Sequence, residues 1–431
     1  MKTLACVHNF GVPARRFIRN GIVDLRAAGH DVRVITDHDR REHDHTPTDS
    51  REAAIPVVVY PWRDTPSSRP RLLRHPIRWL SERLTTNRTG PNTSTLTRRT
   101  NYYLHGGQQR FTEGLRSYIS EFKPDVVHVH FGFTLPAILR GLRGLEIPIL
   151  VTWRGVDASA FLRRPAYVKA VAAALRDRRV YSSAVSQSLH DSLSSYGIMS
   201  NRRSLLPTSI DLDYYQPKAL PNGAGSTTKF LQISSDTPKK GIVTTLRAFS
   251  KYHSAYPNQD WHLTVAGGEV ERIRPKVVEL GLSDRVTLVG KVTPAAAREL
   301  LHSADCFVHH SITPPDGDME GIPNAILEAM AMELPVLVSD HSGIPEVVTN
   351  GVNGRVVPQA DMAAYLEAIH SLHQPGRYPQ NREIIKARFS REVHAATLAN
   401  IYAHVRDDYA RRGKVPQIRC KNLLDGLLGR G

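Results

Sequence analysis

The stretch DGDMEGIPNAILEAM, from Asp316 to Met330, places a glycine and a proline between a strand-like run and a helical one. It follows CFVHHS, an apolar run that begins at Cys306 and is typical of a buried strand. Pro323 stands where a first-turn proline belongs, so the sequence predicts a helix that begins at about Ile322. The free N–H groups and positive dipole of such a helix end favour an anionic ligand such as a diphosphate.

Two glutamates flank the start of this predicted helix. Glu320 precedes it and Glu328 lies two turns inside it, so a rise of about 1.5 Å per residue separates them by roughly 12 Å. This exceeds the roughly 5 to 9.5 Å of a hydrolytic carboxylate pair, and we expect the two glutamates to contact opposite ends of one extended ligand. The alternative is an ordinary capped helix with Ile326, Leu327 and Met330 in the core and Glu328 in solvent.

Strand-like and helical runs alternate along the whole chain, whose 431 residues are too many for one ordinary core. Strand-like runs begin at Thr3, Asp31, Ile55, Asp125, Ile147 and Val180 in the first half, and at Lys229, His262, Arg285, Cys306, Pro335 and Gly354 in the second. Most are apolar enough to be buried on both faces, which predicts parallel sheets. The fold class is therefore α/β, with two doubly wound, Rossmann-like domains that face each other across a cleft.

A Pro, Gly and Ser cluster, PKALPNGAGSTT from Pro217 to Thr228, is typical of a linker between domains. It predicts a first domain over residues 1–216 and a second over residues 217–390. A polar, basic insertion over about 37–100 interrupts the first domain. Residues 391–431 are expected to form a C-terminal helix and a basic tail that pack back on the first domain.

The net charge of +16 calls for an anionic partner, and its distribution narrows the choice. Residues 63–99 contain arginines at 63, 69, 71, 74, 78, 83, 88, 98 and 99, interleaved with tryptophan, isoleucine and leucine. Two interpretations stay open: adhesion to an anionic membrane or a phosphate-bearing lipid acceptor, and a solvated insertion without a partner. The basic residues of 411–421 add weak support for the membrane. No aromatic-basic recognition module is visible, so nucleic acid is not expected as a partner.

The chain has no apolar run near the roughly 20 residues that a membrane-spanning helix needs, and its N-terminus turns polar too early for a signal peptide. Cys6, Cys306 and Cys420 lack the spacing of a zinc site or a disulfide framework. We therefore expect a cytoplasmic protein, either free or peripheral on the inner face of the cell membrane.

The segment E-G-I-P-N-A-I-L-E resembles the E-x7-E signature of retaining glycosyltransferases of family 4, which have the GT-B fold. The surrounding stretch from Ser311 to Pro358 is similar to the branch that builds bacterial exopolysaccharides, the colanic-acid type included. The resemblance implies a hexosyltransferase that moves a sugar from a nucleotide-diphosphate sugar to a glycan or lipid-linked acceptor, in exopolysaccharide, capsule or lipopolysaccharide biosynthesis. Glu320 would then bind donor-sugar hydroxyls, Asn324 and neighbouring amides the diphosphate, and Glu328 the ribose.

The segment SSDTPKKG, from Ser234 to Gly241, joins a strand to a helix and places Lys240 where it can neutralise a phosphate. In the resembling family an arginine precedes this lysine by five residues, and here that position is Ser235. Lys239 or Arg154 could supply the missing charge. A third segment, HSGIPEVV from His341, could form a backbone cradle at its glycine. The expected donor-binding residues are Ser235, Lys239, Lys240, Gly267, Gly321, Ile322, Pro323, Asn324, Glu328, Gly343 and Ile344.

The first domain carries its candidate residues at strand ends. Arg154 stands where the family motif T-x-H-G-x-D has a histidine, and a permanent cation there suggests an anionic donor sugar or acceptor, or a substitute for the missing arginine. A histidine in such a strand is otherwise often an interior group. The expected acceptor-side residues are Asn9, Gly11, His128, His130 and Asp157, and the expected catalytic residues are Glu320, Lys240, His130 and Arg154.

The resemblance implies transfer with retention of configuration, in which the leaving diphosphate helps to deprotonate the acceptor hydroxyl. No cofactor and no metal ion are expected, and the Asp316-Gly-Asp318 pattern is interpreted as incidental. Positioning and charge stabilisation by Lys240 and helix ends would supply the catalysis. The alternatives are a catalytically inactive GT-B scaffold, and a nucleotide-sugar hydrolase or epimerase.

Overall fold

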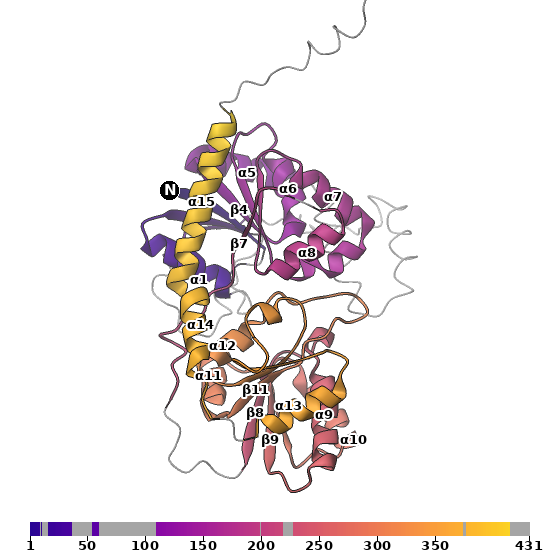
Figure 1. Ribbon diagram of the computed structural model, residues 1–431. Helices are drawn as coiled ribbons and strands as arrows, with labels where there is room; N and C mark the ends of the chain where they lie inside the picture. Colours follow the sequence, from indigo (N-terminus) through magenta and orange to yellow (C-terminus); the bar gives the residue numbers. More distant parts are fainter. Residues whose placement is uncertain are drawn as a thin grey trace, which may run out of the picture.

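The computed structural model describes residues 1–8, 10, 16–36, 54–59, 109–198, 200–218, 227–373 and 376–413. They form two α/β domains, one above the other in Figure 1, joined in sequence near the predicted linker. Asn9, Gly11 and the basic residues 63–99 lie outside the described part of the chain, as does the tail after Gly413.

The N-terminal domain contains a parallel sheet of seven strands in the order β3-β2-β1-β4-β5-β6-β7. Its central strands are buried along their whole length, as expected of apolar strands covered by helices on both faces. The strands are β1 Lys2–Val7, β2 Asp31–Thr36, β3 Val57–Val59, β4 Val126–His130, β5 Ile149–Trp153, β6 Val180–Ala184 and β7 Arg203–Leu205. The helices are α1 Arg16–Ala27, α5 Gln109–Phe122, α6 Leu135–Gly141, α7 Pro165–Leu175 and α8 Gln187–Ser195.

The C-terminal domain repeats this plan with a six-stranded parallel sheet in the order β10-β9-β8-β11-β12-β13. Its strands are β8 Thr228–Ile233, β9 Trp261–Ala266, β10 Val286–Val289, β11 Cys306–His309, β12 Val336–Ser339 and β13 Arg355–Val357. Its helices are α9 Ile242–Ala255, α10 Arg274–Glu279, α11 Pro294–Ser303, α12 Asn324–Ala331, α13 Met362–Ser371 and α14 Pro379–Phe389. The α/β fold class with two doubly wound domains is confirmed.

In each sheet the chain order reverses beside the first strand of the domain. The reversal lies between β1 and β4 in the N-terminal sheet and between β8 and β11 in the C-terminal sheet. Loops that leave neighbouring strands in opposite directions diverge there, and ligands of doubly wound domains bind at such points. Lys240 follows β8 and Glu320 follows β11, so the topology brings them to the same switch point.

The last helix, α15 (Arg391–Gly413), runs along the N-terminal domain in Figure 1. It begins next to α14 and packs along α1, where Tyr402, Val405 and Tyr409 join the buried core of the N-terminal domain. Its first residue, Arg391, donates hydrogen bonds to Asp24 of α1 and to Asp211, the latter at 2.7 Å. The C-terminal helix therefore ties the two domains together. None of the helices in the described ranges is long and apolar enough to cross a membrane.

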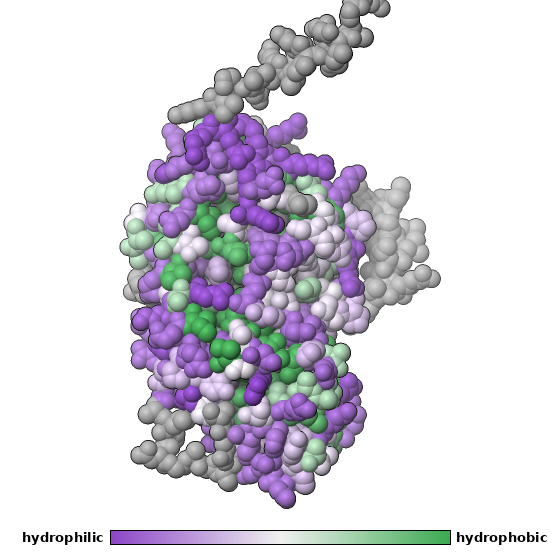
Figure 2. Space-filling view, in the orientation of Figure 1, coloured by the Kyte–Doolittle hydropathy of each residue, from purple (hydrophilic) through white to green (hydrophobic). Residues whose placement is uncertain are grey.

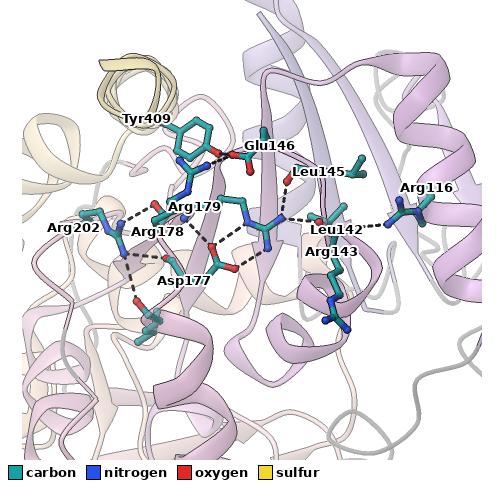
Figure 3. A network of polar contacts seen from close by, with 11 residues as sticks. Arg116, Leu142, Arg143, Leu145, Glu146, Asp177, Arg178, Arg179, Arg202 and Tyr409 are labelled. Atoms are coloured by element: carbon teal, nitrogen blue, oxygen red, sulfur yellow. Dashed lines mark hydrogen bonds and ion pairs between the residues drawn. The ribbon is translucent and has the colours of Figure 1, made fainter. Parts of the chain in front are cut away.

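Arginines near the amino ends of β6 and β7 donate hydrogen bonds to backbone carbonyls at and just after helix ends (Figure 3). Arg179 donates to the carbonyl oxygens of Leu142 and Leu145, each at 2.7 Å, and pairs with Asp177. Arg202 likewise donates to carbonyls at the end of α7. The last carbonyls of a helix lack intrahelical partners, and cationic side chains stabilise them. Part of the positive charge of this domain is therefore structural, and Figure 2 shows a mostly hydrophilic surface at the upper end of the molecule.

Replacing Arg391 by methionine should destabilise the protein, because it leaves the partly buried carboxylates of Asp24 and Asp211 without their cation. The expected loss in the free energy of unfolding is about 2 to 4 kcal/mol. Urea denaturation of the whole chain measures it. The matched control is Arg411→Met, at an exposed arginine of the same helix, which should change the free energy by less than about 0.5 kcal/mol. Equal effects of the two substitutions would contradict the role of Arg391.

Candidate active site

Loops from the two domains touch at the carboxyl ends of β5 and β11. Gly155 follows β5 with φ +152°, and a Cβ added to it would lie 3.2 Å from the carbonyl oxygen of Met319. The Ser159 hydroxyl, from the same loop, accepts a hydrogen bond from the Met319 amide at 3.0 Å. Gly321 abuts Val185 of the N-terminal domain so closely that a Cβ would lie 2.5 Å from its Cγ2. The segment that carries Glu320 is therefore held at the domain boundary.

Glu320 is the centre of a compact cluster of buried charges. Its carboxylate lies 3.0 Å from Nζ of Lys240 and 3.4 Å from Nζ of Lys239, and its side chain is only 13% exposed. Burial by itself raises the pKa of a carboxyl group, but Lys240 and Lys239 outweigh it and hold the pKa of Glu320 at about 2. Glu320 is therefore an anion, and the two lysines are preassembled around one negative charge.

Asp318 joins the same cluster through Lys239, whose Nζ lies 3.0 Å from its carboxylate. Burial raises the pKa of Asp318, because Lys239 only partly offsets it and the nearby anion of Glu320 raises the pKa further. Burial also opposes the charge of Lys239, but its two carboxylate neighbours prevail and raise its pKa. Interpreting the Asp316-Gly-Asp318 pattern as incidental was thus incomplete, because Asp318 orients a lysine of the cluster.

Two residues of the loop after β12 hold the backbone of Glu320. Nε2 of His341 accepts a hydrogen bond from the Glu320 amide at 3.1 Å, and the Ser342 hydroxyl donates to the Glu320 carbonyl at 2.6 Å. The sequence pattern of this loop pointed to its glycine and to neither of these side chains. Both residues could have been found from the sequence, because they directly follow an apolar strand of the same sheet and loops after such strands converge.

The loop of the two lysines needs a glycine at its end. Gly241 has φ +60°, and an added Cβ would lie 1.8 Å from the carbonyl oxygen of His310. Only glycine allows this conformation and this close approach. Gly267 shows the same need after β9, because an added Cβ would lie 2.0 Å from the Ser234 carbonyl oxygen. Ser235, at the position of the family's arginine, is exposed beside this turn and lies outside the charge cluster.

The helix predicted from Ile322 begins at Asn324 instead. Pro323 has an extended conformation, with φ −61° and ψ 124°, and therefore precedes the helix as its N-cap rather than forming its first turn. Ile322, Asn324 and Glu328 are half-buried, and Pro323 is buried. Glu328 lies inside α12, on a different segment from Glu320, as the spacing predicted.

The expected backbone cradle at Gly343 and Ile344 is not supported. The Gly343 amide donates to the carbonyl of Gly321 at 3.2 Å, and the Ile344 amide donates to the carbonyl of His341 at 3.1 Å. Both amides are thus used inside the protein. Gly343 serves close packing instead, since an added Cβ would lie 2.8 Å from the Gly321 carbonyl oxygen.

On the N-terminal side, His130 and Arg154 form a contact at the ends of β4 and β5. Nη2 of Arg154 lies 3.0 Å from Nδ1 of His130, and because a guanidinium only donates, this ring nitrogen accepts. The guanidinium also lies over the ring of Phe17, 4.5 Å from its centroid. The structure therefore brings the two candidate residues of this domain together.

His128 and Asp157 do not occupy acceptor-facing positions. His128 is fully buried, with Nδ1 2.7 Å from the Tyr402 hydroxyl and Nε2 2.7 Å from the Thr152 hydroxyl. The carboxylate of Asp157 is also fully buried and accepts hydrogen bonds from the amides of Gly132, Arg154 and Gly155. Both side chains are thus buried, and they support the site through hydrogen bonds within the protein. Tyr402 was missed because it lies 274 positions from His128 in the chain.

His309 ends β11 beneath the charge cluster. It is fully buried, and neither ring nitrogen has a hydrogen-bond partner among the described residues. Burial, with Lys240 nearby, lowers its pKa to about 3, so the ring is neutral near pH 7. Its ring is stacked on that of Phe307, at 6.2 Å between centroids.

His309 should make stability depend on pH. Because its folded pKa lies below the ordinary value of 6.5, the unfolded chain binds more protons between pH 6.5 and 3, and stability falls as the pH drops through that window. The contribution is about 1.4 kcal/mol per pH unit. Urea denaturation between pH 7 and 4 should show a smaller slope for His309→Phe than for the wild type. An unchanged slope in His309→Phe would contradict this account.

Comparison with known proteins agrees with this arrangement. Residues 221–388 match the family Glycosyl transferases group 1, and residues 14–207 match the Glycosyl transferase 4-like domain. The colanic acid biosynthesis glycosyltransferase WcaL of Salmonella typhimurium is 25% identical over 369 residues, which are 84% of this chain and 88% of that protein. The amylovoran biosynthesis glycosyltransferase AmsK of Erwinia amylovora is 28% identical over 255 residues, 59% of this chain and 62% of that protein.

Solved structures show the same fold at low sequence identity. Sucrose-phosphate synthase from Thermosynechococcus elongatus superposes with a TM-score of 0.70 at 17% identity, covering 94% of this chain and 99% of that one. HepE from Anabaena superposes with a TM-score of 0.68 at 16% identity, covering 94% of this chain and all (100%) of that one. The chain thus combines a region that matches Glycosyl transferases group 1 with one that matches the Glycosyl transferase 4-like domain, has the GT-B fold, and is a glycosyltransferase.

Proposed function

We propose that the protein transfers a sugar, with retention of configuration, from a nucleotide-diphosphate sugar to a glycan or lipid-linked acceptor in exopolysaccharide biosynthesis. The names of the relatives WcaL and AmsK support the biosynthetic context. The titles of HepE structures name UDP and UDP-glucose as bound ligands, which supports the class of donor. The observation that carries the proposal is the cluster of Glu320 with Lys239 and Lys240 at the switch point of the second sheet.

The charges of the cluster suit a diphosphate. Lys239 and Lys240 are 19% and 18% exposed, so each is largely withdrawn from water and its field is weakly screened. Their partners are carboxylates, which a diphosphate can replace as an anionic ligand. A diphosphate bound to the lysines would release the carboxylate of Glu320 toward the hydroxyls of the donor sugar. Lys239 would then supply the second cation that Ser235 cannot.

The same groups account for the chemistry. As the bond from the sugar to the diphosphate breaks, negative charge grows on the leaving oxygen, and Lys240 stabilises it. A phosphate oxygen takes the proton from the acceptor hydroxyl on the same face of the sugar, so no covalent nucleophile of the protein is needed. Because the lysines supply the positive charge and Asp318 is paired with Lys239, we also infer that no metal ion is required.

The N-terminal domain would bind the acceptor. Arg154 and His130 lie on its side of the boundary, and the Arg154 carbonyl lies close enough to Gly321 that an added Cβ would be 3.6 Å away. A cation there suits an anionic acceptor. Arg411 and Arg412, exposed near the end of α15, would contribute to contact with an anionic membrane surface.

The donor role of the cluster can be tested with Glu320→Gln and Lys240→Ala. Transfer from a sugar nucleotide to a lipid-linked glycan should fall by a factor on the order of 10² to 10³ in each variant. Lys240→Ala loses charge stabilisation in the transition state, and Glu320→Gln loses the carboxylate that binds the donor-sugar hydroxyls. Lys240→Ala should also weaken the thermal shift produced by UDP or GDP. The matched control is Lys251→Ala, at an exposed lysine of α9, which should behave as the wild type. Full transfer activity in Glu320→Gln would refute the proposed role.

Retention is tested separately by the anomeric configuration of the product. An NMR time course started from an α-linked sugar nucleotide should show the α-linked product first. A β-linked first product would overturn the retaining mechanism. A wild-type chain that binds neither UDP, GDP nor ADP would instead favour a scaffold, and release of free sugar without an acceptor would favour a hydrolase.

A further inference from the structure

Glu346 of the C-terminal domain reaches across the domain boundary to the beginning of α8. Its two carboxylate oxygens accept hydrogen bonds from the backbone amides of Gln187, at 3.0 Å, and Ser188, at 2.9 Å. Arg388 donates to the Glu346 carbonyl at 2.9 Å and anchors its backbone in its own domain. Glu346 itself ends the short 3-10 turn Ile344–Glu346.

This contact completes the cap of α8. The first amides of a helix lack intrahelical acceptors, and an anion next to them is favoured by the helix dipole. Within its own domain α8 has one cap, the Ser186 hydroxyl, which accepts from the Leu189 amide. The acceptors for the amides of Gln187 and Ser188 come from the other domain. The cap is therefore complete only when the two domains meet as they do here.

The same contact leads to the charge cluster through two hydroxyls. Oγ of Ser188 lies 3.0 Å from Oγ of Ser342, and Ser342 donates its own proton to the Glu320 carbonyl. Ser188 is therefore the donor in the first contact. Ser342 has φ +49°, a left-handed conformation that costs a non-glycine residue free energy and persists only where its surroundings hold it.

The two domains are packed too closely next to this contact for either to shift independently. An added Cβ on Gly343 would lie 2.8 Å from Cβ of Ser186. An added Cβ on Gly321 would lie even closer, 2.5 Å from Cγ2 of Val185. The loop of Gly343, the segment of Gly321 and the start of α8 thus interlock, so a shift of one domain against the other must move the Glu320 segment or break these contacts.

We propose that Glu346 is an interdomain latch and a positioning residue for the reaction. It holds the C-terminal domain on the start of α8, and through Ser188 and Ser342 it makes the position of the Glu320 backbone depend on that docking. The inference deepens the proposed function, because it assumes that Glu320 acts on the donor. Its structural half, the latch, stands without that assumption.

The latch is tested on the ligand-free full chain with Glu346→Ala and the nearly isosteric Glu346→Gln. Small-angle X-ray scattering should give a larger radius of gyration for Glu346→Ala than for the wild type, and an intermediate value for Glu346→Gln, which keeps one acceptor oxygen. The matched control is Glu367→Ala, at an exposed glutamate of α13, which should scatter as the wild type. Circular dichroism checks that each variant is folded. Identical scattering of Glu346→Ala and the control would overturn the latch.

The positioning role is tested by kinetics with UDP-glucose or GDP-mannose, whichever donor the wild type uses. In Glu346→Ala, kcat should fall about tenfold while the donor KM and the Kd of UDP or GDP stay within twofold, because the cluster that binds the diphosphate lies in one domain. Glu346→Gln should recover part of kcat. A rise in KM with unchanged kcat would overturn the positioning role. If the wild type transfers sugar from no UDP-, GDP- or ADP-linked donor, the proposed function fails, while the scattering result still decides on the latch.

Discussion

The burial of Glu320 between Lys239 and Lys240 is the interaction on which the arrangement of this site depends. Two cations at the end of one loop would repel each other if no anion lay between them, and a buried carboxylate without a cation would be protonated. Together the three charges are stable away from water. The loops after β8, β11 and β12 are arranged around this requirement: the first carries the lysines, the second the carboxylate, and the third fixes the carboxylate's backbone.

The N-terminal domain supports its side of the boundary with uncharged hydrogen bonds. Tyr402, His128, Thr152 and Ser183 form a buried chain with contacts of 2.6 to 2.7 Å, and the ring of His128 lies against that of His130, 4.0 Å between centroids. Because Tyr402 belongs to α15, the helix that joins the domains also supports the candidate acceptor site. Both domains therefore contribute supporting hydrogen bonds at the same boundary.

Much of the fold could be read from local pattern. Apolar runs of strand length alternating with helical runs, and a Pro, Gly and Ser cluster between the two series, predicted two parallel α/β domains because buried parallel strands are apolar on both faces. Glu320 and Lys240 were also identified from their places after strands. The start of α12 was misplaced by two residues, since Pro323 fits either the first turn or an extended N-cap, and only its backbone conformation distinguishes them.

The sequence by itself determined the order of the elements, the residue types at their ends and hence the chemistry available at the switch point, because these depend on neighbours in the chain. Only the tertiary structure decided how that chemistry is used. Asp318 orients a lysine, Asp157 and His128 bind inward, and Glu346 caps a helix of the other domain. Each of these depends on contacts between segments far apart in the chain, whose partners are set by packing and are not encoded in any local spacing.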